Sequence, residues 1–176
     1  MFAKMSNLRE VSFESNLLTG TIPTDFSAMS QLEILHLSTN KLSGTIPSGI
    51  GTLPILRQIH LNDNALTGSL PTALGHLGGL NELWLQSNKL KGSIPTDLGR
   101  LHELETFFVE DNQLTGVIPT SMATMKSIKS FRAHLNSFNG NVPNEICELK
   151  KTHLKFLTSD CKGKVTCPKG CCNECY

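Results

Sequence analysis

The fold is decided by the 24-residue stretch 80–103, which reads LNELWLQSNKLKGSIPTDLGRLHE. Its pattern returns along the chain at a constant spacing of 24 residues. Three residue types mark the period, and each returns six times: asparagine (Asn16, Asn40, Asn64, Asn88, Asn112, Asn136), glycine (Gly20, Gly44, Gly68, Gly92, Gly116, Gly140) and proline (Pro23, Pro47, Pro71, Pro95, Pro119, Pro143). Such a fixed period is the signature of a solenoid, so each stretch is predicted to form one coil.

Each coil is predicted to begin with a short strand. Leu83 and Leu85 flank Trp84, and this alternation places the leucines on the inner face and the tryptophan on the outer face. Stacked coils then give a parallel sheet. The asparagine that follows, such as Asn88, stands where the chain turns inward, and its amide can bond backbone groups of its own coil and of the next. We therefore predict a structural asparagine ladder.

The rest of each coil predicts two further elements. Residues 90–95 form a second short extended stretch, in which glycine permits close approach and proline ends the pairing. Residues 96–101 form a short helical turn, with Leu98 and Leu101 facing the core. The expected architecture is an α/β solenoid with a concave parallel sheet and helical turns on the convex side.

Composition excludes several classes of protein. The chain has 176 residues, of which 39% are hydrophobic and 18% charged, which is too apolar for intrinsic disorder. Its net charge of +1 argues against binding to nucleic acid. No stretch is long and apolar enough to suggest a membrane span, and residues 1–6 show no signal-peptide pattern.

The cysteines indicate the compartment. All six lie near the end of the sequence and are expected to form disulfides: Cys147, Cys161, Cys167, Cys171, Cys172 and Cys175. A zinc site is the alternative, but the spacing fits no regular zinc pattern, and neighbouring Cys171 and Cys172 point in different directions. Disulfides predict a secreted or cell-surface protein. The spacing leaves the connectivity open.

The repeated pattern LxxLxLxxNxLxGxIPxxLGxL resembles the plant-type extracellular leucine-rich repeat. The resemblance covers residues 1–144 as six repeats and implies a right-handed superhelix. Residues 145–176 are similar to the cysteine-rich caps of diatom and algal leucine-rich repeat proteins, which implies a disulfide-stapled C-terminal cap. Such families serve as receptor ectodomains, receptor-like proteins and enzyme inhibitors, so the resemblance implies recognition and not catalysis.

One column of outward residues is the candidate binding surface. In coil order it contains Ser12, His36, His60, Trp84, Phe108 and Arg132. Tryptophan and arginine are frequent interface hot spots, which favours binding by Trp84 and its neighbours, although packing between the rings is an alternative. His36 and His60 lack an obvious third metal ligand or a nucleophile, so we expect no catalytic residue, metal or cofactor.

The neighbouring columns add acidic and polar groups to this surface. The further candidate binding residues are Glu82, Glu110, Asp63, Asp111 and Gln86. Six acids (Glu10, Glu14, Asp63, Glu82, Glu110, Asp111) and one base (Arg132) stand in the outward columns, which gives −5 with histidine neutral. This charge favours a peptide or protein partner with a basic surface. An ordinary solvated face is the alternative.

Other functions stay open at this point. A structural or assembly role in the cell wall would use the coil ends and the lysine-rich tail. Rows of threonine and serine on the outer side, such as Thr24, Ser48 and Thr72, admit ice binding, although these residues also suit turns. The first coil shows no cap in the sequence. We therefore expect a missing segment or a neighbouring chain to cover Phe2, Met5, Val11 and Phe13.

Overall fold

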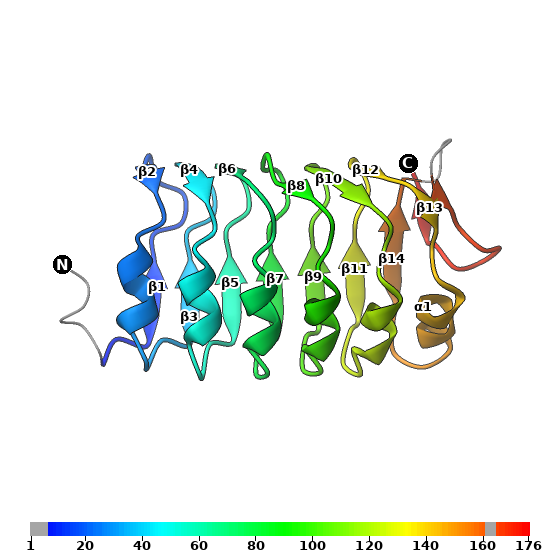
Figure 1. The fold of residues 1–176 in the computed structure, drawn as a ribbon, viewed down its shortest axis with the longest axis horizontal. Coiled ribbons are helices and arrows are strands. Elements are labelled where there is room, and N and C mark those ends of the chain that lie inside the picture. Colours follow the sequence, from blue (N-terminus) through cyan, green and yellow to red (C-terminus); the bar gives the residue numbers. More distant parts are fainter. Residues whose placement is uncertain (1–6, 161–164) are drawn as a thin grey trace.

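The computed structural model describes residues 7–160 and 165–176, with the side chain of Cys175 left out. Its main sheet has eight parallel strands that follow one another along the molecule (Figure 1). They are β1 (Glu10–Ser12), β3 (Ile34–His36), β5 (Gln58–His60), β7 (Glu82–Trp84), β9 (Thr106–Phe108), β11 (Ser130–Arg132), β14 (Phe156–Ser159) and β16 (Glu174–Cys175).

The register of this sheet follows the sequence period. His36 pairs with His60, His60 with Trp84, and Trp84 with Phe108, so residues 24 positions apart lie side by side. Side chains at equivalent positions therefore form straight rows across the strands.

A second set of short strands forms small parallel sheets further along the coils. One contains β2 (Thr19–Thr21), β4 (Lys41–Thr45) and β6 (Ala65–Thr67); another contains β8 (Lys91–Gly92), β10 (Gln113–Gly116) and β12 (Ser137–Phe138); the last pairs β13 (Gly140–Asn141) with β15 (Val165–Thr166). These are the second extended stretches that the repeat predicted.

Short helical turns complete the coils. Five-residue 3₁₀ helices occupy η2 (Thr24–Ala28), η3 (Ser48–Thr52), η4 (Thr72–His76), η5 (Thr96–Arg100) and η6 (Thr120–Thr124), followed by α1 (Asn144–Glu148) and η7 (Leu149–Lys151). An extended proline precedes each of the five, as Pro95 does with φ −64° and ψ 138°. Leu98 and Leu101 are fully buried, which confirms the predicted turn over residues 96–101.

The core is one continuous apolar cluster running through every coil, from Val11 to Cys171. Close packing between helical turns explains the glycine within η4. A Cβ on Gly75 would lie 2.4 Å from the carbonyl oxygen of Asp97, so only glycine permits this approach. None of the helices within residues 7–160 and 165–176 has the length and apolar content needed to cross a bilayer.

The six repeated asparagines line up beside the main sheet. Five of them, all except Asn16, bond the backbone of two coils. Asn88 is typical: its Nδ2 contacts the carbonyl oxygens of Leu61 at 3.0 Å and Leu85 at 3.1 Å. Its Oδ1 accepts from the backbone N–H of Leu66 at 2.9 Å. Leu61 and Leu66 belong to the preceding coil, so Asn88 and its four counterparts from Asn40 to Asn136 connect their own turn to the neighbouring coil.

The residue before each asparagine adopts a left-handed conformation, which the sequence did not reveal. Six non-glycine residues have φ between 54° and 58°: Ser15, Thr39, Asp63, Ser87, Asp111 and Leu135. Side chains rarely adopt this region, so the chain must be held there by its surroundings. Bonds from the next coil supply that constraint: the backbone N–H of Asp63, for example, donates to the carbonyl oxygen of Gln86 at 3.0 Å.

The C-terminal segment continues the main sheet. Strand β14 pairs with β11, and β16 pairs with β14, so residues after the expected boundary at 144/145 add two strands. The carboxylate of Asp160 accepts from the backbone N–H groups of Leu135 at 2.5 Å and Asn136 at 2.8 Å. It thereby satisfies groups that a further coil would bond. The division into residues 1–144 and 145–176 stays a proposal based on where the period ends.

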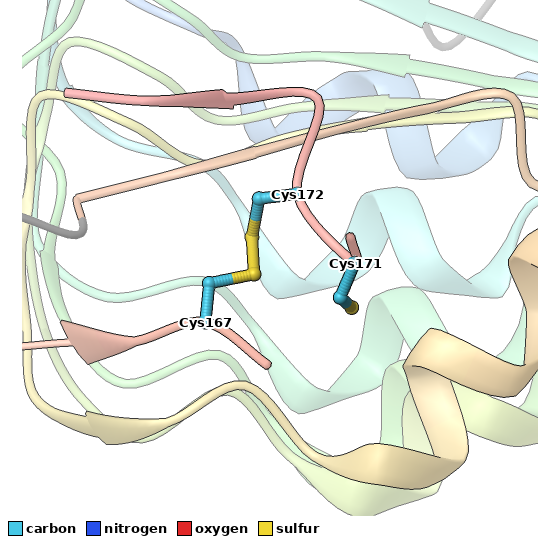
Figure 2. A group of neighbouring side chains, drawn as sticks. All are labelled: Cys167, Cys171 and Cys172. Atoms are coloured by element: carbon cyan, nitrogen blue, oxygen red, sulfur yellow. A yellow bond between two sulfur atoms is a disulfide. The ribbon is translucent and has the colours of Figure 1, made fainter. Parts of the chain in front are cut away.

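Among the cysteines that the structure describes, two disulfides hold this segment, as the cysteine pattern predicted. Cys167 bonds to Cys172, while the side chain of the adjacent Cys171 points away from this bond (Figure 2). Cys171 bonds to Cys147, so the two adjacent cysteines have different partners. The sulfurs of Cys167, Cys171 and Cys172 lie within 4.8 Å of one another, but as disulfides they are not thiolate ligands for zinc. Cys161 and the side chain of Cys175 lie outside the described part.

The first coil differs from the expectation in one respect. Val11 was expected to be uncovered but is 3% exposed and belongs to the continuous apolar core. Phe13 is 47% exposed and Leu17 76% exposed at the same end. Phe2 and Met5 lie outside the described residues.

The asparagine ladder yields a test with an internal control. Asn88→Ala should lower the free energy of unfolding by about 2 to 4 kcal/mol, because it leaves the Leu66 N–H and buried carbonyls unpaired. Asn16 is exposed, and its Nδ2 contacts only carbonyls of its own coil. Asn16→Ala should therefore cost less than about 1 kcal/mol. Urea unfolding of both variants measures this difference, and equal losses would show that bonding between coils is not what matters.

Candidate binding surface

The outward side chains of the main sheet form the surface that we call the open sheet face. Its central row contains Ser12, His36, His60, Trp84, Phe108, Arg132, Thr158 and Glu174, because the strand register aligns these residues. The row joins the five central candidates from the sequence and extends them into the C-terminal segment.

The aromatic residues of this row form a continuous stack. The ring centroids of His36 and His60 lie 3.9 Å apart and nearly parallel, and those of His60 and Trp84 lie 3.8 Å apart. Trp84 and Phe108 follow at 5.7 Å, and the Arg132 guanidinium lies 4.6 Å from the centre of the Phe108 ring. We call this arrangement the ring stack.

The ring stack changes how Trp84 can act. Both of its faces are covered, by His60 and Phe108, and its Nε1 donates to Thr106 Oγ1 at 2.9 Å. His60 was expected to face solvent but is 7% exposed, because its neighbours enclose it. The packing alternative considered from sequence is thus realised, and the interior of the stack offers ring edges to a ligand.

The two histidines are fixed by acceptors in the neighbouring row. His36 Nε2 lies 3.0 Å from Gln58 Oε1, and His60 Nε2 lies 2.9 Å from Glu82 Oε2. Gln58 in turn donates to Glu82 at 3.2 Å. Burial lowers the pKa of His60 below 6.5, as does the charge of His36, while the hydrogen bond to Glu82 opposes the shift. A neutral, stacked imidazole is therefore favoured at neutral pH.

A polar row lies on the other side of the ring stack. Ser38 Oγ donates to Asn62 Oδ1 at 2.7 Å, and Asn62 Nδ2 donates to Asp63 Oδ2 at 2.7 Å. Gln86 is half-buried in the same row, next to Glu110. Among the sequence candidates, Asp63 and Asp111 stand slightly apart from this row, on the left-handed turns.

The carboxylate of Glu110 is partly buried in the open sheet face, next to Arg132. Its Oε2 is buried with no hydrogen-bond partner among the described residues, and its Oε1 lies 3.8 Å from Arg132 Nη1. Burial raises its pKa above 4.5, while a backbone hydrogen bond and the Arg132 charge act in the opposite direction.

The C-terminal end of the open sheet face is hollowed. A cavity of about 320 Å³ is lined by Glu110, Arg132, His134, Phe156, Thr158, Asn173, Glu174 and Tyr176. The rings of His134 and Tyr176 stack at 4.0 Å. Sequence reasoning missed Phe156, Glu174 and Tyr176, because they follow the last repeat and no period assigns them to the sheet.

The extra strands increase the negative charge of the surface. Glu174 joins the six acids of the repeats, so seven acids face one arginine, or −7 + 1 = −6 with histidine neutral. The chain as a whole is +1, so all other residues together carry +1 − (−6) = +7. Charge is therefore strongly segregated onto the open sheet face.

Family models match much of the repeated region. A model described as leucine rich repeat matches residues 31–90, and a second model of the same description matches residues 7–29. A search of curated proteins gives no match.

Solved structures of plant receptors are similar to the chain. The peptide hormone receptor RGFR1 from a plant, in complex with RGF2, is 32% identical over 90% of this chain and 26% of its own, with a TM-score of 0.85. The Arabidopsis receptor kinase HAESA, in complex with the peptide hormone IDA and the co-receptor SERK1, is 30% identical over 90% of this chain and 27% of its own, with a TM-score of 0.84. This chain thus spans about a quarter of each.

A shorter relative is covered more completely. The structure of the BIR3–SERK2 complex from Arabidopsis thaliana contains a chain that is 37% identical over 76% of this chain and 69% of its own, with a TM-score of 0.63. Sequence and structural similarity therefore hold over most of both chains.

The ring stack predicts a fluorescence change with pH. Trp84 is the sole tryptophan, and protonation of the stacked His60 should quench its emission. Because the pKa of His60 is lowered, the midpoint of the fluorescence change should fall below pH 6.5. The unfolded chain binds this proton at a higher pH than the folded protein does. The folded state should therefore lose stability as the pH falls from about 6.5 toward the pKa of the folded protein. His60→Gln should abolish the transition, and His36→Gln should raise its midpoint. A transition that persists in His60→Gln would contradict the assignment.

Proposed function

The chain belongs to the leucine-rich repeat family, and we propose that it is a non-catalytic recognition module that binds a peptide or protein on the open sheet face. Structural neighbours support this proposal, since RGFR1 is described in complex with RGF2 and HAESA in complex with IDA. These partners belong to those receptors; for this chain they indicate the class of ligand, a peptide or a protein.

The shape of the surface supports an extended ligand. Eight strands at a spacing of about 4.8 Å give a face about 34 Å long, which suits a peptide or the edge of a protein. The ring stack is held rigidly by contacts along its length, and rigid, partly buried aromatics make effective binding surfaces because little side-chain freedom is lost on binding.

The segregation of negative charge onto the open sheet face is the main observation that favours a basic partner. The open sheet face has a net charge of −6, and only Arg132 offsets its seven carboxylates. A partner with a basic surface would be attracted over a distance and oriented by this field. The binding residues of the proposal are the ring stack together with Glu82, Glu110, Asp63, Asp111 and Gln86.

An extracellular location forms part of the proposal. The two described disulfides of the C-terminal segment are stable in an oxidising environment, and similar plant structures include the ectodomain of a membrane receptor kinase and the HAESA receptor kinase complex. A receptor-like or inhibitor role is consistent with both features.

Selection from a displayed library of random 12-residue peptides tests this function. Peptides enriched on the wild-type protein should be rich in lysine and arginine, and the variant Glu82→Lys combined with Glu14→Lys should weaken them at least tenfold, because it changes the face by four charge units. Isothermal calorimetry measures the affinities, and raising the salt concentration should weaken binding.

A charge reversal away from the face is the matched control. Glu103 is exposed in the loop before β9 and forms no ion pair with any residue described. Glu103→Lys should leave the affinities within twofold of wild type. Failure to enrich any peptide, or equal losses in the face and control variants, would refute binding at the open sheet face.

A further inference from the structure

The two ends of the ring stack are different. At one end, the Arg132 guanidinium lies over the Phe108 ring at 4.6 Å, with the Glu110 carboxylate 3.8 Å from its Nη1. At the other end, His36 pairs in register with Ser12 of β1. A serine is too small to cover a ring. Among the residues that the structure describes, the stack is therefore capped by a cation on one side and open on the other.

The open end has room for a planar group. One face of His36 contacts His60 at 3.9 Å, and within residues 7–160 and 165–176 no ring or cation lies on its other face. Ser12 is exposed, as are the residues on either side of it along the face. A flat group lying above Ser12 would continue the stack at the spacing set by the strands.

Two carboxylates frame the same position. Glu10 and Glu14 lie two residues before and after Ser12, on the same face of the strand, and both are exposed. No cation in the described part of the chain forms an ion pair with either of them. Within the described part of the chain, the open end thus presents two carboxylates without a counter-charge.

These features indicate the chemistry of a partner side chain that would bind above Ser12. We infer that an arginine side chain of the bound peptide or protein occupies the position above Ser12, with its guanidinium stacked on His36 and bonded to Glu10 and Glu14. This inference rests on the proposed function for the existence of the partner. Arg132 shows within the molecule that a guanidinium with a nearby carboxylate suits the end of this stack.

Arginine fits this position better than the alternatives. A guanidinium is planar, stacks on aromatic faces and offers five donors in a plane, so it can contact the ring and both carboxylates together. A lysine ammonium carries the same charge but has no flat face to stack. An aromatic side chain would stack but would leave the two carboxylates partly desolvated without a donor.

The experiment uses small probes and therefore does not depend on the natural partner. N-acetyl-arginine amide, N-acetyl-lysine amide and N-acetyl-tyrosine amide are titrated into the isotope-labelled protein, and shifts of the Glu10–Glu14 backbone amides and the His36 ring are followed by NMR. The arginine probe should shift both sets saturably, with a dissociation constant at least fivefold lower than that of either other probe. Equal affinities for arginine and lysine would reduce the site to charge attraction and overturn the inference.

Two variants separate the contribution of stacking on His36 from the contribution of the carboxylate charge. Ser12→Phe places a ring over His36 and should abolish the preference for arginine, while Glu14→Gln should weaken the arginine probe at least threefold. Glu103→Gln is the control and should change nothing. Arginine binding that survives Ser12→Phe would also overturn the inference.

Failure of this site and failure of the proposed function can be told apart. If peptides are selected on the open sheet face but the arginine probe does not bind, the arginine site is wrong and the proposed function stands. If the arginine probe binds but no peptide does, only the proposed function is refuted.

Discussion

The structure depends on the parallel pairing of residues that are 24 positions apart. Backbone bonds between strands maintain this register, and the asparagine side chains reinforce it where the chain turns and cannot satisfy its own backbone groups. A slip of one residue would move every leucine from the core to the outer face. The buried leucines and the asparagine row therefore enforce the same alignment.

Strict alignment has a consequence for recognition. Similar side chains at equivalent positions are brought into contact with one another, so the rings of His36, His60, Trp84 and Phe108 use their faces within the protein. What remains for a ligand is the edges of the rings, the carboxylates beside them and the ends of the stack. A surface of this kind selects partners by charge and by fit at its ends more than by a deep pocket.

The period predicts the coil, its strands, the helical turn and the inward leucines, because these features repeat and each repeat supports the others. The sequence does not reveal the left-handed residues such as Asp63, since their conformation is imposed by bonds from the next coil. It also misses β14 and β16, where Asp160 replaces the repeated contacts, and the burial of His60 by stacking. Pairing of Cys147 with Cys171 likewise depends on distances that spacing does not fix.

The central claim is that each coil is an interchangeable unit defined by register. Removing residues 65–88 joins Asn64 to Lys89 and preserves the pattern, whereas removing residues 65–87 shifts it by one position. Urea unfolding followed by circular dichroism compares the two shortened proteins directly. We expect a cooperative unfolding transition for the 24-residue deletion and the loss of cooperativity for the 23-residue deletion. Equal cooperativity in the two proteins would contradict this expectation.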